Sequence, residues 1–270
     1  NLSRFVASYQ TTATLKLGEL WAIPIMLRLA LIENLRRVAV RIAACRRDRD
    51  AANSWADHLL EIAEKEPRNL VLALADMVRE DPPLTSAFVA EFARHLRGQN
   101  PGLTLPMNWL EQQLAEANQT IEELIQLESQ NQATDQVSMS NSIGSLRFLP
   151  TMDWQEFVET MSAVERTLRS DPADVYNDMD FATRDRYRHV VEDIAKQSPL
   201  SEHEVARRAI QLARDRIAHI GGDDRTAHVG YYLIDRGRSL LERAVGVRPS
   251  TTIILRRIGR QIPLLFYIGS

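Results

Sequence analysis

The stretch WQEFVETMSAVERTL, at residues 154–168, decides the fold that we expect for this chain. Asp153 directly precedes the stretch and Glu156 follows three residues later, the spacing at which two side chains satisfy free backbone N–H groups at the start of a helix. Its apolar side chains recur at spacings of three and four residues, which places them on one helix face: Trp154, Phe157, Val158, Met161, Val164 and Leu168. The pattern predicts one amphipathic helix that buries this face.

Helical patterns of the same kind fill most of the chain. The pairs Ser201 with Glu204 and Thr120 with Glu123 repeat the capping arrangement ahead of apolar residues. Further amphipathic stretches are predicted at residues 55–63, 70–78, 86–97, 107–117, 181–196 and 227–245. Only residues 251–255 read like a strand. We therefore expect an all-α fold, a multi-helix bundle of about ten helices with little or no sheet.

The polar stretch at residues 128–142 leaves two interpretations open. It is rich in Gln, Asn and Ser, and it is either a linker between two helical halves or a solvated helix that continues from Thr120. We favour the helix. We expect one helical region over residues 1–245, with a possible subdivision near 128–150.

Composition restricts the class of protein. The 270 residues are 44% hydrophobic, which is enough for a sizeable core, and the formal net charge of -3 lacks the basic excess of a nucleic-acid-binding protein. We therefore expect no nucleic-acid partner. Cys45 is the only cysteine, which excludes an internal disulfide and a cysteine-based metal cluster. Because the chain starts at Asn1 without a signal pattern, we expect it to be an internal piece of a longer protein.

Two apolar stretches bear on contact with a membrane. Residues 20–32 contain Arg28 and are shorter than the ~20 apolar residues of a membrane span, so they predict a buried helix. Residues 246–270 lack acidic residues, and they end in an apolar run at 262–268. This segment is either a basic juxtamembrane stretch that leads toward a membrane span or a terminal amphipathic helix. Its arginines are Arg248, Arg256, Arg257 and Arg260.

Short motifs that suggest chemistry have structural explanations in this sequence. Asp178 and Asp180 have the spacing with which sugar-nucleotide transferases hold a cation, but Asp180 directly precedes a helical pattern and is a natural N-cap. The Gly-Gly-Asp-Asp run at residues 221–224 lies between two helical patterns, where a loop is expected. Gly237, inside a helical pattern, predicts a tight helix–helix crossing.

The histidines and arginines define no site by their spacing. His219 and His228 bracket residues 221–224, and we expect one to be exposed and the other to be hydrogen-bonded. None of the six histidines shows a metal-ligand spacing: His58, His95, His189, His203, His219 and His228. Five arginines form a candidate phosphate cluster that we interpret as solvated and paired: Arg184, Arg186, Arg188, Arg207 and Arg208. We therefore assign no catalytic, cofactor-binding or metal-binding residue.

Six longer strings carry a family resemblance. They are GELWAIPIMLR at 18–28, NSIGSLR at 141–147, the helical pattern at 152–161, DFATRDRYR at 180–188, HVGYYLIDRGR at 228–238 and PLLFY at 263–267. Together they are similar to cyclic β-1,2-glucan synthases over essentially the whole chain. Members of that family are very large inner-membrane proteins that build and cyclise β-1,2-linked glucan from UDP-glucose.

The resemblance implies a place and a role for the chain. It implies the cytoplasmic region that precedes the membrane-embedded glycosyltransferase domain, on the cytoplasmic face of the bacterial inner membrane. The expected partners are the downstream transferase and membrane domains of the same polypeptide and the membrane surface, through Arg248, Arg256, Arg257 and Arg260. UDP-glucose and a divalent cation are expected for the parent transferase, and no cofactor in this segment.

The resulting hypothesis is a non-catalytic region that supports or positions the transferase. One alternative is a helical carbohydrate-active domain resembling a glycosidase, which needs two carboxyl groups roughly 5 to 9.5 Å apart across a cleft. The other is a generic scaffold for protein interaction.

Overall fold

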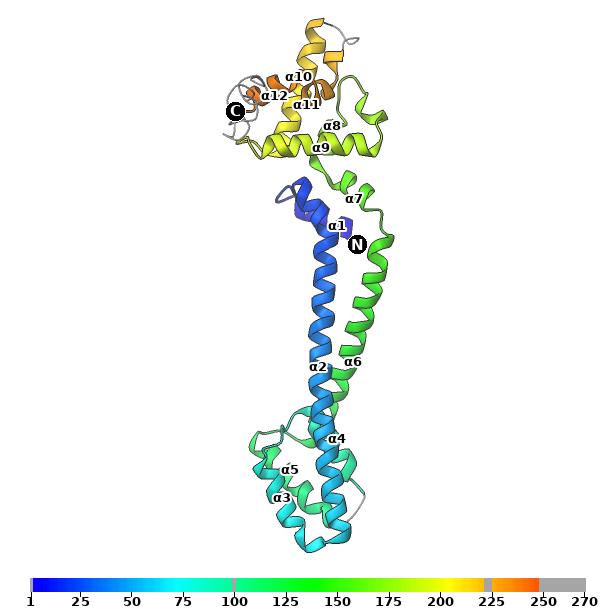
Figure 1. Cartoon of the computed structure of the whole chain (residues 1–270), viewed down its shortest axis with the longest axis vertical. Helices are drawn as coiled ribbons and strands as arrows, with labels where there is room; N and C mark the ends of the chain where they lie inside the picture. Colours follow the sequence, from blue (N-terminus) through cyan, green and yellow to red (C-terminus); the bar gives the residue numbers. More distant parts are fainter. Residues whose placement is uncertain (1, 99–100, 221–224, 248–270) are drawn as a thin grey trace, which may run out of the picture. The chain divides into compact units, whose positions relative to one another are not determined.

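The computed structural model describes residues 2–98, 101–220 and 225–247. Within these ranges the chain forms twelve α-helices, joined by short 3-10 turns, and contains no strand (Figure 1). The predicted all-α fold is confirmed, with two helices more than expected.

The chain divides into two compact units. The first unit is formed by Asn1–Met26 with Met152–Ser270, and the second by Leu27–Thr151. The long helix α2 (Leu17–Lys65) belongs partly to each. The first unit also holds α1 (Leu2–Gln10), α7 (Trp154–Met161), α8 (Ala163–Leu168), α9 (Phe181–Ala195), α10 (Glu202–Ile220), α11 (Val229–Ile234) and α12 (Arg238–Ala244). The second holds α3 (Leu70–Arg79), α4 (Ser86–Leu96), α5 (Thr104–Glu116) and α6 (Ile121–Phe148).

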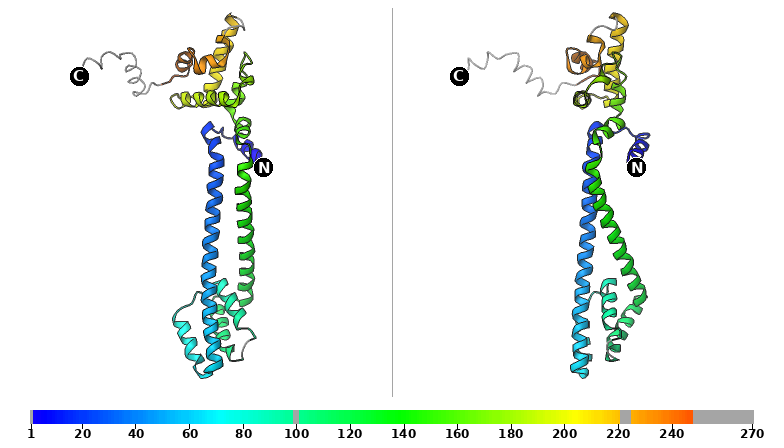
Figure 2. Two further views of the ribbon diagram at one scale, coloured as in Figure 1. Left: turned by 45° about the vertical axis from the view of Figure 1, so that its right-hand side comes forward. Right: turned by 90° about the vertical axis from the view of Figure 1, so that its right-hand side faces the viewer.

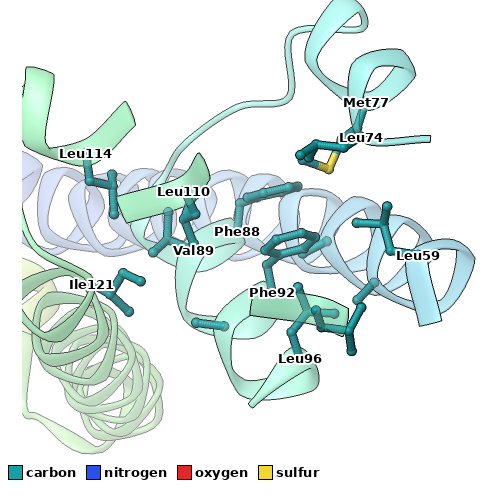
Figure 3. Packing of buried hydrophobic residues seen from close by; sticks show 14 of the residues in the cluster. Leu59, Leu74, Met77, Phe88, Val89, Phe92, Leu96, Leu110, Leu114 and Ile121 are labelled. Atoms are coloured by element: carbon teal, nitrogen blue, oxygen red, sulfur yellow. The ribbon is translucent and has the colours of Figure 1, made fainter. Parts of the chain in front are cut away.

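The second unit combines a helical hairpin with a small bundle. Helix α6 runs antiparallel beside α2. The shorter helices α3 to α5 pack at the end of this hairpin that is formed by the C-terminal part of α2 and the start of α6 (Figures 1 and 2). The bundle core is apolar (Figure 3): Phe88 and Phe92 stack with ring centroids 5.4 Å apart, and Leu59, Met77 and Leu110 are fully buried around them. Burial of these side chains is what holds the short helices in place.

The first unit packs its helices around α10. The buried face of α10 carries several small side chains, which let α8, α9 and α11 approach it closely. The residues of this face are Val205, Ala206, Ala209, Ile210 and Ala213. A smaller cluster joins Val6 of α1 and Leu20 of α2 to Phe157 and Val158 of α7.

The predicted helix starts are confirmed. Thr120 and Glu123 form a reciprocal capping box, and α6 then continues without a break through residues 128–142. The linker interpretation of that stretch is therefore wrong. Asp153 and Asp180 each accept a hydrogen bond from the backbone N–H three residues later, as expected of N-caps. Ser201 and Glu204 cap each other in the same way as Thr120 and Glu123.

Two predicted helices are interrupted in the structure. The helix expected over residues 154–168 breaks at Ser162, whose extended backbone (ψ 121°) lets its hydroxyl accept from Glu165 N and start α8. The stretch 227–245 is divided into α11 and α12 by the extended residue Asp235. Gly237 lies between them, and a Cβ there would come within 2.5 Å of the Tyr231 ring. The close approach predicted at this glycine is thus between two successive short helices.

Residues 20–32 are helical but only partly buried, which corrects the expectation of a buried helix. Leu20 is inaccessible to solvent, whereas Leu29 and Ile32 are more than half exposed. The predictions for residues 221–224, for the strand at 251–255 and for the arginines of 246–270 lie outside the described residues.

Candidate functional site

Arg188 on α9 is the centre of a buried network of ion pairs. Its side chain is fully buried, and its Nη1 donates to Glu159 Oε1 at 3.0 Å and to Glu165 Oε2 at 2.6 Å. Its Nη2 donates to Asp185 at 3.0 Å. The guanidinium carbon also lies 5.0 Å from the centre of the Phe181 ring, which adds a cation–π contact.

Two more arginines and a tyrosine complete this network, which we call the Arg188 cluster. Arg184 donates from Nε and Nη2 to the two carboxylate oxygens of Glu159, both at 3.0 Å, which is a bidentate geometry. Arg169 Nε donates to Glu165 at 2.9 Å, and the Tyr176 hydroxyl donates to the same carboxylate at 2.7 Å. Each of the two glutamates therefore accepts from several donors at once.

The break at Ser162 explains why these side chains meet. It ends α7 just after Glu159 and starts α8 just before Glu165, so that both carboxylates face α9. On α9, Arg184 and Arg188 are four residues apart and thus lie on one face, one turn from each other. The break at Ser162 brings two acidic residues together, and the regular helix α9 supplies their counter-charges.

The electrostatics of the Arg188 cluster favour the ionised form of Glu159. Burial alone would raise the pKa of Glu159, but hydrogen bonds from Arg184 and Arg188 outweigh it, and the pKa lies below its ordinary value. Burial and the charge of Glu165 raise the pKa of Tyr176 far above its ordinary value, so its hydroxyl stays protonated and donates. A glycosidase acid needs a raised carboxyl pKa beside an open cleft. Glu159 has a lowered pKa and Glu165 is fully buried, so neither carboxyl group fits that arrangement.

A second buried pair links the loop after α8 to the start of α11. The Asp171 carboxylate accepts from Val229 N at 2.9 Å and pairs with His228 Nδ1 at 2.6 Å. His228 Nε2 is buried without a hydrogen-bond partner among the described residues. A Cβ at Gly230 would lie 2.5 Å from the Tyr187 hydroxyl and 2.6 Å from His228 Nε2, so only glycine fits this position.

The structure separates the five arginines predicted to be solvated and paired. Arg188 corrects that prediction, since it is fully buried, and the Arg184 side chain is only 16% exposed. Arg186, Arg207 and Arg208 are exposed as expected. The cluster is buried because Arg184 and Arg188 share the face of α9 that packs against α8. Their spacing of four residues allows this shared face, but we had predicted that both arginines are exposed to solvent.

The predictions for His219, His228 and Asp180 agree with the structure. His219 is exposed and His228 is hydrogen-bonded, as expected. Asp180 caps α9, while Asp178 is exposed in the preceding turn. Across the part of the chain that the structure describes, no group of three or more His, Cys, Asp or Glu side chains is placed to hold a metal ion.

Sequence reasoning missed the acidic half of the cluster. Glu165 follows Val158 by seven residues and Met161 by four, so in the predicted continuous helix it would lie on the same face as these apolar residues. A carboxylate on an otherwise apolar face was the available signal, because such a group is buried only with a partner. Asp171 and Tyr176 lie in a loop and gave no periodic signal.

These features define a helical protein in which most buried charges pair with one another, although Arg188 Nε has no hydrogen-bond partner among the described residues; the arrangement is suited to holding helices together. Over 252 residues the chain is 32% identical to the cyclic beta-(1,2)-glucan synthase NdvB of Rhizobium meliloti (strain 1021). This similarity covers 93% of the chain, and the chain spans only 9% of the length of that synthase. The resemblance to cyclic β-1,2-glucan synthases is therefore confirmed, and the chain corresponds to one segment of such a protein.

Two further findings concern the family models and the helices of the chain. No protein-family model matches it. Among the helices of the described residues, none combines the length and the apolar character needed to cross a bilayer.

Proposed function

We propose that this chain is a non-catalytic, cytoplasmic helical region of a cyclic β-1,2-glucan synthase, where it supports or positions the glycosyltransferase. The observation that carries the proposal is the similarity to a synthase over 93% of the chain, within a single segment that makes up 9% of that protein. A segment of this size, similar throughout, behaves as a distinct structural part of a larger polypeptide.

The Arg188 cluster supports a structural role. Hydrogen bonds from Arg184 and Arg188 lower the pKa of Glu159, and Glu165 is fully buried, so neither is poised for proton transfer to a substrate. Removing one member of such a network leaves uncompensated buried charge. The network thus stabilises one relative placement of α7, α8 and α9, which is what a supporting part requires.

The remaining elements of the proposal concern the parent protein. Its transferase would use UDP-glucose and a divalent cation, and would lie with the membrane domains further along the same polypeptide. The segment would face the cytoplasm, with Arg248, Arg256, Arg257 and Arg260 near the inner-membrane surface, where basic residues on the cytoplasmic side are favoured.

A deletion experiment in the full synthase tests this role. The segment equivalent to residues 2–247 is removed in frame, and a second synthase carries only Arg188→Met. We expect both to make less cyclic glucan from UDP-glucose, or rings of altered size, with the deletion more severe. Arg186→Met serves as the matched control, because Arg186 is exposed on the same helix. A deleted synthase that assembles and makes normal rings at the normal rate would overturn the proposal.

The isolated chain allows a separate test of whether this segment has catalytic activity of its own. Incubated with linear and cyclic β-1,2-glucan, it should release no new reducing ends. Release that disappears in Glu159→Gln would instead favour a carbohydrate-active domain.

A further inference from the structure

The helical hairpin of the second unit is polar on the inside. Asn34 on α2 donates to Ser138 at 3.0 Å and to Ser142 at 2.9 Å on α6. About two and four turns further along α2, Arg41 pairs with Asp135 and Arg49 lies 4.0 Å from Glu128. These contacts identify the side of α2 that faces α6.

The opposite side of α2 is mostly apolar and uncovered. At 100° per residue, the positions of 28–47 that lie opposite the α6-facing side form what we call the outer face: Leu29, Ile32, Arg36, Ala39, Val40, Ala43 and Arg47. Leu29, Ile32 and Val40 are 56%, 54% and 57% exposed. Unlike an ordinary hairpin in water, this one has several paired polar groups inside, beside the buried Val38, and exposed aliphatic side chains outside.

The outer face is bordered by positive charge. Residues 28–47 contain six arginines and one acidic residue, a net charge of +5, in a chain whose net charge is -3. Arg28 and Arg37 lie along the two flanks of the outer face. Arg36, at its centre, is already neutralised by two 2.8 Å hydrogen bonds to Glu33. Exposed arginines on either side of an aliphatic stripe are the pattern of a helix that lies in a membrane interface.

We propose that the outer face of α2 binds the surface of a bilayer that contains anionic lipids. Leu29, Ile32 and Val40 enter the interface, and the flanking arginines contact phosphate groups, each adding electrostatic attraction. A second copy of the chain fits this face less well, because two such faces would bring like-charged arginines together without acidic partners. The outer face consists of other residues than the C-terminal arginines of the proposed function.

Vesicle binding by the 270-residue chain tests the proposal. Co-sedimentation is measured with phosphatidylcholine vesicles and with vesicles that also contain phosphatidylglycerol. We expect binding to the mixed vesicles, weakening as salt rises because salt screens the arginines. Replacing Leu29, Ile32 and Val40 together by Gln should reduce the affinity at least about tenfold, since the apolar contribution is lost. Arg28→Gln with Arg37→Gln should reduce the affinity and flatten its salt dependence.

The same unit offers a matched control. Val71, Leu72 and Val78 on α3 are also exposed aliphatic residues, with exposed fractions of 62%, 66% and 43%, and their replacement by Gln should leave binding unchanged. Far-UV circular dichroism checks that every variant keeps its helix content. A chain with the four C-terminal arginines changed to Gln should still depend on the outer face, which separates the two surfaces.

Three results would overturn the proposal. They are absence of binding to the mixed vesicles, equal binding by the outer-face variant, and a concentration-dependent dimer that only the outer-face variant loses. The last result would assign the face to a second copy of the chain. Since vesicle binding is measured on the isolated chain and glucan synthesis on the full synthase, each proposal can fail without the other.

Discussion

Both units place charged pairs between helices, but the two sets of pairs differ in their access to water. In the first unit, the Arg188 side chain is 0% exposed and that of Glu165 is 1% exposed. In the hairpin of the second unit, Arg41 and Arg49 remain 57% and 35% exposed, although Asp135 and Glu128 are buried. The same chemical pairing therefore has different energetic consequences in the two places, because only the hairpin arginines can be hydrated when a partner is lost.

Helix length accounts for the difference. Short helices interrupted at Ser162 surround Arg188 on several sides, so its guanidinium group has no route to solvent. Two long antiparallel helices, α2 and α6, form the hairpin. The aliphatic parts of the arginine side chains lie between these helices, and their charged ends reach water. The comparison predicts that substitutions of similar chemistry will differ in cost between the units.

The largest effect is expected from Arg188→Met. It removes one counter-charge shared by Glu159 and the fully buried Glu165, and breaking such a network costs about 3–5 kcal/mol of unfolding free energy. Amide hydrogen exchange, measured by peptide mass spectrometry, should rise in α7 to α9. Arg186→Met is the control and should change little, because Arg186 is exposed. Equal effects of the two variants would show that the burial of Arg188 does not set the cost of its replacement.

In the second unit the core is apolar, and Leu110→Ala should cost about 2–5 kcal/mol through lost burial and a cavity. Hydrogen exchange should rise in α4 and α5 and stay unchanged in α9, if the two units unfold separately. Leu105→Ala, on the same helix at a 40% exposed position, is the matched control. Faster exchange in both units would show that they unfold together.

Asp135→Asn sharpens the comparison between the charged pairs. The substitution removes the charge that Arg41 meets in the hairpin, but the exposed guanidinium group can turn to water. We expect a loss of unfolding free energy well below that of Arg188→Met, measured by urea denaturation of both variants. A loss as large as that of Arg188→Met would mean that the hairpin pair is effectively buried.

The smallest effect concerns pH. Burial raises the pKa of Glu202, whose carboxylate accepts from Leu17 N at 2.8 Å at the start of α2. A raised folded-state pKa means that its favourable contribution is complete below the ordinary value of 4.5 and is lost as pH rises through the raised value. Glu202→Gln should therefore flatten the decline in melting temperature from pH 4.5 toward neutrality. Glu204→Gln is the contrast, since a hydrogen bond from Ser201 lowers the pKa of Glu204 and its contribution is lost only as pH falls.

Much of the secondary structure was readable from local patterns. The capping pairs at Thr120 and Ser201 marked true helix starts, because capping depends on residues only three positions apart. The break at Ser162 was missed because the apolar period continues across it. Serine gives no clear signal of a break, since it occurs both at helix N-caps and within solvent-exposed helices. The two short helices that replace the stretch 227–245 were missed for a similar reason, since Asp235 and Gly237 interrupt a pattern that is otherwise helical.

By itself the sequence determined the all-α class, most helix positions and the resemblance to cyclic β-1,2-glucan synthases, all of which depend on local periodicity or on direct identity of residues. Only the tertiary structure decided which charges are buried. Arg188 and Glu165 are 23 residues apart, and Asp135 and Arg41 are 94 apart. A local pattern shows which side of a helix is apolar, but not what packs against it, and for that reason the buried cluster and the uncovered outer face of α2 emerged only from the fold.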